Sequence, residues 1–278
     1  MRPVNAEVLF VHLFPVPEAL MEAAPKLKYI LSARGGLENI DVEAAKKRGI
    51  SIINCPAHNA YAVAEYTIGL IIAETRNIGR ADIALSEGVW RERYPNSKAI
   101  PELRSLTIGI VGFGTIGRLV AERLKVFGCK ILVQDPYVSK QDVEALGCER
   151  VDMPELLSKA DVITLHGRIP AGAPALIGKD EFKQMKKTAY LINTARAVLV
   201  DTDALADALR NHEIMGAAVD VYPTEPLPED FPLLHLDNIT LTNHRGGDTI
   251  DSYIKAPEML CDQLQELLEK GTTRFLVR

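Results

Sequence analysis

Short apolar runs alternate with segments of helical periodicity over most of the chain beyond residue 107. Each run is typical of a buried strand, and the stretches between them place apolar residues every three to four positions. This alternation predicts a parallel sheet that helices cover on both faces. Strands are predicted at 107–111, 130–134, 161–165, 189–193, 217–221 and 239–242, and helices at 115–127, 154–159, 179–185 and 202–211.

The first 60 residues show the same alternation in shorter segments. Strands are predicted near 7–12, 28–32 and 50–54, and helices at 17–24 and 42–48. A long helical stretch runs from 62 to about 85, and an amphipathic helix at 252–270 ends before Gly271. Because single cores stop growing near this length of 278 residues, we expect two domains. The first is 1–60, completed by the C-terminal helix at 255–278, and the second is 61–254.

Composition and charge narrow the range of partners. Hydrophobic residues make up 47% of the chain and charged residues 25%, the balance of a globular protein with a sizeable core. The formal net charge of -5 argues against a nucleic-acid partner, which usually needs a basic face. No apolar run approaches the roughly 18 residues of a membrane span, and the start lacks a signal cleavage site, so we expect a cytoplasmic protein without a membrane partner. The four cysteines form no C-x-x-C pair, which favours reduced thiols and no metal site.

A glycine-rich segment after the strand at 107–111 carries the strongest local signal. Gly112, Gly114 and Gly117 form G-x-G-x-x-G between an apolar strand and a helix. The first glycine permits a tight turn, the second lets the backbone approach a pyrophosphate, and the third lets the helix pack closely on the strand. The helix N-terminus then attracts the phosphates. This pattern predicts a dinucleotide site in a Rossmann-type, doubly wound α/β domain.

An acidic residue, Asp135, follows the next predicted strand. A carboxylate there accepts hydrogen bonds from the ribose hydroxyls and repels a 2′-phosphate, which favours NAD over NADP as the cofactor. No arginine follows immediately to pair with a 2′-phosphate. The alternative is an ordinary turn residue before Pro136.

Three polar residues follow the later predicted strands. Arg196 comes after AYLINTA, Glu225 after GAAVDVYPT and His244 after ITLTN. Parallel strands point the same way, so these side chains are expected at the carboxyl edge of the sheet beside the glycine turn. His244 would act as the general acid or base toward a carbonyl or hydroxyl, Glu225 would orient its imidazole, and Arg196 would bind a substrate carboxylate.

Each of these residues also has a structural interpretation. An arginine after a strand is often a surface residue, a glutamate between Thr224 and Pro226 is often a solvated turn, and a single histidine is more often a structural hydrogen-bonding group. The joint occurrence of all three at one edge favours the catalytic interpretation, namely hydride transfer between NAD and the 2-position of a small hydroxy or keto acid.

The ordered motifs of the chain resemble those of the D-isomer-specific 2-hydroxyacid dehydrogenase family, which includes phosphoglycerate dehydrogenases and glyoxylate or hydroxypyruvate reductases. The resemblance runs from about Asn5 to the C-terminus. It is carried by ARGGLENID, AVAEYTIGLIIAETRNI, VGFGTIG, DVITLH, LINTARAVLVDTDAL, GAAVDVYPTEPLP and LTNHRGG. It implies an NAD-binding Rossmann domain at 61–254, a smaller flavodoxin-like substrate domain at 1–60, and a homodimer formed largely through the NAD-binding domain and its long helix.

The resemblance also implies roles for individual residues. Arg196, Glu225 and His244 match the catalytic set, Asp220 matches the aspartate that holds the nicotinamide carboxamide, and Arg34, Gly35 and Gly36 match the loop that receives the substrate carboxylate. For Asp220 the alternative is a cap or loop residue, and for Arg34 to Gly36 a simple glycine turn. The expected cofactor-binding residues are Gly112, Gly114, Thr115, Ile116, Gly117, Asp135, Pro136, His166, Thr194, Ala195, Asp220, Gly246 and Gly247, and the expected substrate-binding residues are Arg34, Gly35, Gly36 and Arg196.

The chain departs from the family pattern in four places. Members usually have glycine at the position of Ala197, proline at that of Asn243 and an aliphatic residue at that of Arg245. Arg245 would add positive charge for a phosphorylated or sugar-derived acid, or would simply face solvent. Members also carry two strands and two helices before the segment that begins near Asn5, so we expect the first strand here to be an exposed apolar edge. Three alternatives follow: the substrate domain is abbreviated, a partner chain completes it, or the start of the sequence is wrongly chosen.

Two other functions remain open on the sequence. A non-catalytic, NAD-binding protein of the corepressor kind is consistent with an abbreviated substrate domain, whereas the intact set of Arg196, Glu225 and His244 argues against it. A formate dehydrogenase fits less well, because those enzymes differ at the position of Glu225.

Overall fold

The computed structural model describes residues 5–170 and 172–277, and the chain divides into two compact units. One unit comprises Met1–Asn59 together with Asp248–Arg278, and the other comprises Ala60–Gly247. We call them the small unit and the large unit. Within the described ranges, no helix combines the length and the apolar character that crossing a bilayer requires.

The large unit is built on a seven-stranded parallel sheet in the order β10-β9-β8-β7-β4-β5-β6. Its strands are β4 (Thr107–Val111), β5 (Lys130–Gln134), β6 (Glu149–Arg150), β7 (Val162–Leu165), β8 (Tyr190–Asn193), β9 (Gly216–Val219) and β10 (Ile239–Leu241). The chain extends the sheet in one direction from β4 to β6 and then returns to add β7 on the other side of β4. This reversal is where a doubly wound sheet binds its ligands, and it confirms the predicted Rossmann-type fold class.

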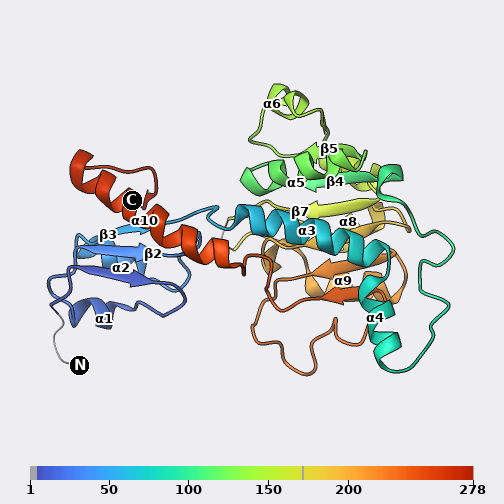
Figure 1. The fold of residues 1–278 in the computed structure, drawn as a ribbon, viewed down its shortest axis with the longest axis horizontal. Coiled ribbons are helices and arrows are strands. Elements are labelled where there is room, and N and C mark those ends of the chain that lie inside the picture. The colour runs from blue at the N-terminus through green and yellow to red at the C-terminus, as the bar shows by residue number, and fades with distance from the viewer. Residues whose placement is uncertain (1–4, 171, 278) are drawn as a thin grey trace. The chain divides into compact units, whose positions relative to one another are not determined.

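Helices cover both faces of this sheet (Figure 1). One face packs against α3 (Ala60–Thr75), α5 (Thr115–Val126) and α6 (Lys140–Ala145), and the other against α7 (Met153–Lys159), α8 (Lys179–Gln184) and α9 (Thr202–Arg210). Ile108 and Ile110 belong to the first core, whereas their neighbour Val111 belongs to the second. Strand residues alternate between faces, so the continuous apolar runs in the sequence serve two buried faces.

The small unit has a four-stranded sheet in the order β1-β2-β3-β11. The parallel strands β1 (Val8–Val11), β2 (Tyr29–Ser32) and β3 (Ser51–Asn54) are joined by an antiparallel β11 (Leu276–Val277). Helices α1 (Glu18–Glu22) and α2 (Val42–Lys47) cover one core, and α10 (Ile250–Lys270) covers the other. β1 lies at the edge, where Val8 and Phe10 are both exposed, as the sequence predicts for an apolar edge strand.

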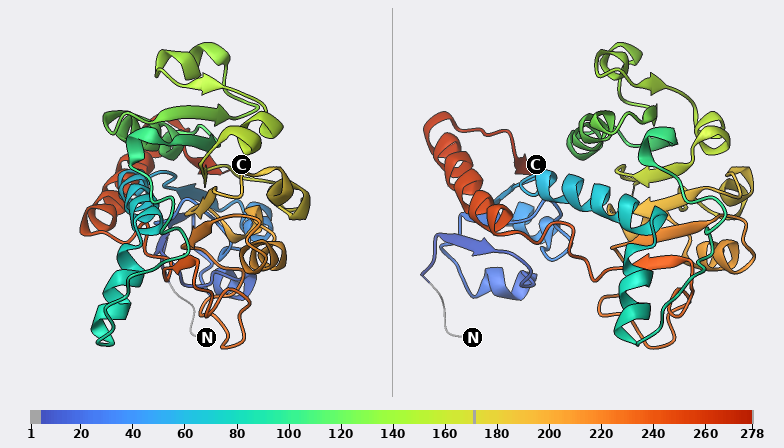
Figure 2. Two further views of the ribbon diagram at one scale, coloured as in Figure 1. Left: turned by 90° about the vertical axis from the view of Figure 1, so that its right-hand side faces the viewer. Right: turned by 45° about the vertical axis from the view of Figure 1, so that its right-hand side comes forward.

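One predicted helix is two helices in the structure. The stretch from 62 to about 85 comprises α3 and α4 (Ile78–Ser86), which run in different directions (Figure 2). Asn77 separates them with a φ of 58°. This left-handed backbone interrupts the helical hydrogen bonds, and asparagine tolerates it better than most residues do. The prediction of a single helix was therefore wrong. The sequence analysis also did not predict α6, β6 and β11.

Candidate active site

The glycine turn after β4 is shaped by two glycines that tolerate no side chain. Gly112 has a φ of 91°, and a Cβ there would collide with the backbone of Gly167. A Cβ on Gly117 would collide with the carbonyl oxygen of Gly112. Gly114 differs, because no atom lies within 4 Å of its hypothetical Cβ. The turn is thus tightly packed at Gly112 and Gly117 and open at Gly114. Because α5 begins directly after Gly114, with Thr115 and Ile116, the turn leaves room for a diphosphate at the free amides of this helix.

Asp135 connects the end of β5 to the glycine turn. Its Oδ2 accepts a hydrogen bond from the Phe113 amide at 2.6 Å, and its Oδ1 accepts one from the Tyr137 amide at 2.8 Å. The second bond spans Pro136 and is a local turn interaction. The first bond holds the carboxylate beside the glycine turn, and each oxygen keeps a lone pair for a ribose hydroxyl.

His166 lies against the opposite side of the glycine turn, because its carbonyl carbon and the Gly167 backbone approach Gly112 closely. Its Nε2 lies 3.0 Å from the Thr164 hydroxyl, while its Nδ1 is buried and has no hydrogen-bond partner. Burial lowers the pKa of His166 to about 3, so the ring is neutral. An unpaired buried nitrogen costs about 1–3 kcal/mol, and a ligand group at the turn would relieve that cost. This orphaned atom and the open position at Gly114 both fit a bound dinucleotide.

The residues proposed for catalysis follow three neighbouring strands. In the register of the sheet, Asn193 of β8 pairs with Val219 of β9, and Val219 pairs with Leu241 of β10. Arg196 and His244 each stand three residues beyond the strand on which they follow, and Asp220 comes directly after β9. The carboxyl edge of the sheet therefore carries all three residues, as parallel topology predicts.

His244 and Glu225 form the most direct contact of the site. The Nδ1 atom of His244 lies 2.9 Å from both carboxylate oxygens of Glu225. Because a carboxylate only accepts, Nδ1 carries the hydrogen, and Nε2 is the ring nitrogen that Glu225 does not engage. Both side chains are partly exposed, at 45% for His244 and 40% for Glu225. The imidazole is therefore oriented and still accessible.

Asp220 fixes the backbone on which His244 stands. The carboxylate is 1% exposed, and it accepts hydrogen bonds from the Arg245 amide at 2.9 Å, the Gly246 amide at 2.8 Å and the Thr242 hydroxyl at 2.6 Å. His244 itself has a φ of 57°. A left-handed histidine needs such support, because this conformation costs of order 1 kcal/mol or more outside glycine. The sequence did not predict this anchoring role.

The turn that carries Arg196 is held by a side chain of β8. Asn193 accepts a hydrogen bond from the Ala195 amide at 3.1 Å and donates one to the Arg196 carbonyl at 3.0 Å. Arg196 is exposed, and its Nη1 donates to the Ala195 carbonyl at 2.7 Å. The hydroxyl of Thr194 is buried 2.8 Å from that of Thr67 on α3, so it is shared with a structural partner.

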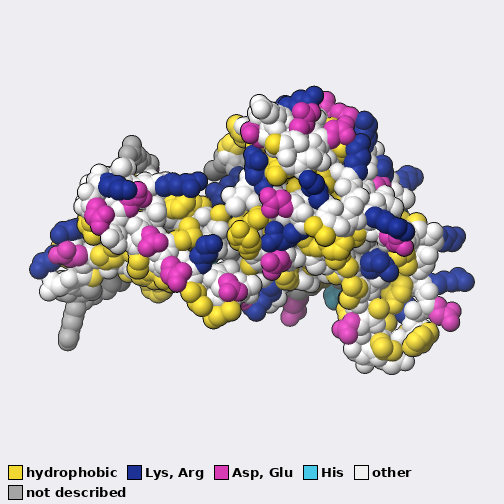
Figure 3. All heavy atoms as spheres, turned by 45° about the horizontal axis from the view of Figure 1, so that its top comes forward, with side chains coloured by type: hydrophobic (Ala, Val, Ile, Leu, Met, Phe, Trp, Pro, Cys, Tyr) yellow, Lys and Arg dark blue, Asp and Glu magenta, His cyan; other side chains and the backbone are white. Residues whose placement is uncertain are grey.

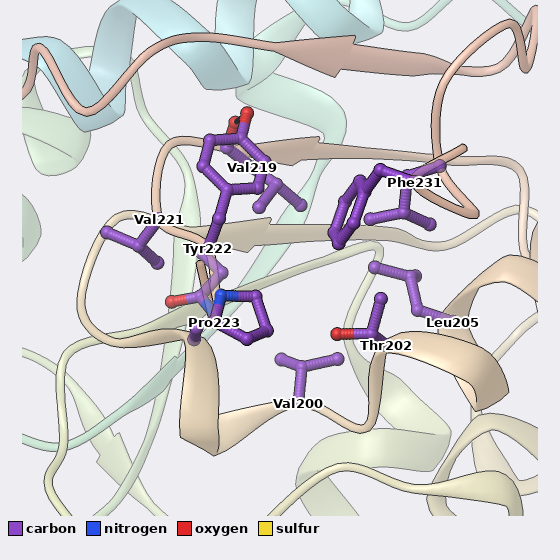
Figure 4. A pocket seen from close by; sticks show the side chains of 11 residues that line it. Val200, Thr202, Leu205, Val219, Val221, Tyr222, Pro223 and Phe231 are labelled. Carbon is purple, nitrogen blue, oxygen red and sulfur yellow. Dashed lines mark hydrogen bonds between the residues drawn. The ribbon is translucent and has the colours of Figure 1, made fainter. Parts of the chain in front are cut away.

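A small cavity lies beneath these turns (Figure 4). It is lined mainly by apolar side chains, including those of Val200, Val219, Tyr222 and Phe231, and the rings of Tyr222 and Phe231 meet edge to face at 5.7 Å. Its volume of about 10 Å³ holds one water molecule at most. The side chains that line the cavity pack beneath the Ala197 turn and the segment before Glu225. The cavity itself is too small for a keto acid.

The predicted carboxylate loop lies at the carboxyl edge of the small unit's sheet. Asn54 donates to the Gly35 carbonyl at 2.9 Å, and the Cys55 amide donates to the Arg34 carbonyl at 3.1 Å. The Glu38 carboxylate lies 3.9 Å from the Arg34 guanidinium and occupies the space above Gly36. Glu38 thus competes with a ligand carboxylate for Arg34.

Two histidines that the sequence did not single out stand at the same edge. His12 follows β1, and its pKa is lowered by burial and then by the charge of Arg34. His58 lies after β3, with its Nδ1 2.9 Å from the Cys55 carbonyl, and burial lowers its pKa too. Both imidazoles are therefore neutral near pH 7 and available as hydrogen-bonding groups beside Arg34. Their positions alone gave no signal, because neither belongs to a recognisable motif.

Sequence and structure comparisons agree with this geometry. Residues 68–246 match the sequence model of the "D-isomer specific 2-hydroxyacid dehydrogenase, NAD binding domain". The matched segment covers most of the large unit, including the glycine turn, Asp135, Asp220 and His244. The chain belongs to the D-isomer specific 2-hydroxyacid dehydrogenase family. The large unit is accordingly its NAD-binding domain, and the prediction of NAD as the cofactor is confirmed.

Individual relatives support the same family. The chain is 41% identical over 267 residues to the D-3-phosphoglycerate dehydrogenase of Methanocaldococcus jannaschii, covering 95% of this chain and 50% of that one. It is also 41% identical over 253 residues to the glyoxylate reductase of Thermofilum pendens, covering 90% of this chain and 74% of that one. The chain thus spans half the length of the first of these relatives.

A solved structure of the family is similar throughout. The NAD-complexed D-isomer specific 2-hydroxyacid dehydrogenase of Lactobacillus delbrueckii ssp. bulgaricus superimposes with a TM-score of 0.82 at 29% sequence identity. The match covers 99% of this chain and 87% of that one. The overall fold of this chain is therefore that of the family.

Proposed function

We propose that the protein interconverts a small D-2-hydroxy acid and its 2-keto acid with NAD as the hydride carrier, and that His244 is the acid and base. The observation that carries this proposal is the contact of His244 Nδ1 with both Glu225 oxygens at 2.9 Å. That contact leaves Nε2 as the proton-exchanging nitrogen. A structural histidine would be expected to have both ring nitrogens engaged or buried, whereas this imidazole is 45% exposed.

The residues of the large unit then have distinct tasks. When bound, the nicotinamide supplies or accepts the hydride at the 2-carbon. In the direction of reduction, Nε2 of protonated His244 donates a proton to the carbonyl oxygen as negative charge develops there, and in oxidation the neutral ring removes the hydroxyl proton. Glu225 orients the imidazole through the contact with Nδ1. Arg196 binds the substrate carboxylate through its guanidinium fork.

The cofactor-binding groups are divided between the turns of the large unit. Gly112, Gly114 and Gly117 shape the diphosphate site, with Thr115 and Ile116 at the start of α5. The ribose is bound by Asp135 beside Pro136. Nicotinamide-binding residues come from the later strands: His166, Thr194, Ala195, Asp220, Gly246 and Gly247. Asp220 keeps acceptor capacity for a carboxamide N–H, because its three bonds leave one of its roughly four lone-pair positions open.

The small unit is proposed to act as the substrate domain. Arg34 and the amides of Gly35 and Gly36 supply positive charge and donors suited to a carboxylate. A bound carboxylate would compete with Glu38 for the Arg34 guanidinium. The neutral imidazoles of His12 and His58 add further hydrogen-bonding groups at this edge.

The test of this function is a screen for NADH oxidation with glyoxylate, hydroxypyruvate, phosphohydroxypyruvate, pyruvate and sugar-derived keto acids. The proposal expects turnover of at least one acid and formation of the D-hydroxy acid. Tight NADH binding without turnover across the panel would instead select a non-catalytic NAD-binding protein.

A homodimer is proposed as the functional assembly. α4 and the segment after it expose the apolar side chains of Ile83, Leu85, Val89 and Trp90, and the last of these is 81% exposed. Apolar side chains gather over this lobe in Figure 3. Several large apolar side chains exposed on one segment are typical of protein interfaces. Sedimentation of the protein as a monomer at micromolar concentration would contradict the dimer.

Replacing Gly114 by aspartate is expected to weaken NADH binding about tenfold or more without lowering the melting temperature. The backbone at Gly114 has a φ of -74°, and a side chain there meets no atom of the protein, so folding is unaffected. The carboxylate would occupy the open space at the helix N-terminus and repel the diphosphate. Fluorescence titration with NADH measures the effect. Gly69→Asp on α3, where a side chain also meets nothing within 4 Å, is the matched control, and equal NADH affinity for both variants would contradict the assignment of this turn.

A further inference from the structure

The guanidinium of Arg150 lies at the Asp135 turn, although Arg150 is distant from Asp135 in the sequence. No arginine follows Asp135 directly, but β6 brings Arg150 to this turn from 15 residues further along the chain. The Nη2 atom of Arg150 donates to the main-chain oxygen of Asp135 at 3.3 Å. β6 is only two residues long and pairs with β5 through Leu132 and Val133.

The pairing register accounts for this contact. Arg150 is the partner of Val133, and Asp135 follows Gln134, the last residue of β5. The guanidinium of Arg150 therefore reaches the main chain just beyond the end of β5. Arg150 is solvent-exposed, and among the described residues no carboxylate pairs with it, so its remaining donors are available for an added anion.

A second guanidinium stands nearby. Arg118 in the first turn of α5 donates from Nε to the Phe113 carbonyl at 3.1 Å, and its guanidinium lies over the Phe113 ring at 4.8 Å. The amide of the same Phe113 donates to Asp135. Arg150 thus contacts Asp135 directly, and Arg118 contacts Phe113, the residue whose amide binds the Asp135 carboxylate.

We propose that Arg150 forms a latent subsite for the 2′-phosphate of NADP, and that the Asp135 carboxylate keeps this subsite closed. Arginine is the side chain best suited to a phosphate, because its planar fork donates two hydrogen bonds to two oxygens. Asp135 excludes the 2′-phosphate by like charge while it accepts hydrogen bonds from the ribose hydroxyls of NAD. Selectivity for NAD thus rests on the one carboxylate. The inference depends on the placement of the adenosine ribose at Asp135 in the proposed function.

The test is a set of binding titrations with NADH, NADPH and 2′,5′-ADP on four forms of the protein: wild type, Asp135→Ser, Arg150→Gln and the double variant. Asp135→Ser is expected to bind NADPH at least about tenfold more tightly than wild type, since a repulsive charge is removed and two arginines remain. The double variant should lose most of that gain. Charge-assisted hydrogen bonds of this kind are worth about tenfold or more in affinity, and the gain should shrink as salt concentration rises.

Two further variants make the outcome interpretable. Asp135→Asn removes the charge but keeps one acceptor for the backbone amides. It replaces Asp135→Ser in the test if the serine variant has a lowered melting temperature. Arg104→Gln removes an exposed arginine that pairs with Glu102 before β4, at the opposite end of the strands, and it should not reverse the gain in an Asp135→Ser background. Equal NADPH affinity for Asp135→Ser and the double variant would overturn the role of Arg150, and so would the absence of any gain in both Asp135 variants. Either result would leave the proposed reaction untouched, because keto-acid turnover by the wild type does not depend on NADPH binding. Conversely, if the NADPH affinities are as expected but the wild type turns over no keto acid, only the proposed reaction is contradicted.

Discussion

Replacing His244 by glutamine is expected to lower kcat for the proposed keto-acid reduction by roughly 10² to 10⁴ fold, because the proposed proton donor and acceptor is lost. Glutamine can still donate a hydrogen bond, but it does not exchange a proton near neutral pH. The backbone of the site should be unaffected, since Asp220 binds the amides of Arg245 and Gly246 and not the imidazole. Steady-state kinetics with saturating NADH measure the effect, and NADH affinity reports whether the cofactor site is intact.

His212→Gln is the matched control for this change. His212 is an exposed histidine that also has a left-handed backbone, with a φ of 51°, but it follows α9 at the opposite edge of the sheet from the active-site turns. Its replacement should leave kcat at the wild-type value. A His244→Gln protein with wild-type kcat would rule out this residue as the acid and base.

Replacing Arg80 by methionine destabilises the large unit by about 3–5 kcal/mol, because it leaves a buried carboxylate without its charge partner. Glu74 is 1% exposed, and its Oε1 lies 2.7 Å from Nη2 of Arg80, whose side chain is 9% exposed. The other oxygen, Oε2, accepts from the Thr240 hydroxyl at 2.6 Å. Gly216 leaves space for this carboxylate, since a Cβ there would collide with Glu74. Chemical denaturation of wild type and variant measures the loss.

The loss should depend on pH in a defined direction. Burial raises the pKa of Glu74 even with Arg80 beside it, and removal of Arg80 raises that pKa further. A carboxyl group with a raised pKa holds its proton in the folded state after the unfolded state has released it, so stability falls as pH rises from the unfolded pKa through the folded one. The deficit of Arg80→Met should therefore be smallest at acidic pH and largest above neutrality.

The double variant Glu74→Gln, Arg80→Met separates the lost ion pair from lost packing. It should recover a substantial part of the stability, since the isolated charge is gone. Arg104→Met, at a side chain that is 75% exposed, should change nothing measurable. An Arg80→Met protein with wild-type stability at pH 8 would contradict the account of this pair.

The main elements of the fold could be predicted because their signals are local. The strands of the large unit were placed within one or two residues, since each is an apolar run bounded by polar or glycine residues. β6 could not be found this way, because Glu149 and Arg150 are both exposed and the strand exists only by pairing with β5. β11 likewise depends on its pairing with β3. The division of α3 from α4 at Asn77 involves neither glycine nor proline, so the sequence carried no clear break signal.

The residues at the site were predictable to the extent that topology alone brings them together. Arg196, Asp220 and His244 follow adjacent parallel strands, so their common edge follows from the strand order. The positioning of His244 by Asp220 was not predictable, because it depends on a left-handed backbone and on two main-chain amides. The approach of Arg150 to Asp135 depends on the register of β6 and is also invisible in the sequence.

The most direct test of the account is the fate of a deuterium atom carried on C4 of the reduced nicotinamide. With a keto acid that the protein turns over, mass spectrometry and chiral chromatography should find one deuterium at C2 of a D-hydroxy acid. Hydride transfer at this site would be contradicted if the protein binds the reduced dinucleotide but oxidises it with no keto acid of the panel. It would also be contradicted if the C2 hydrogen of the hydroxy acid comes from water.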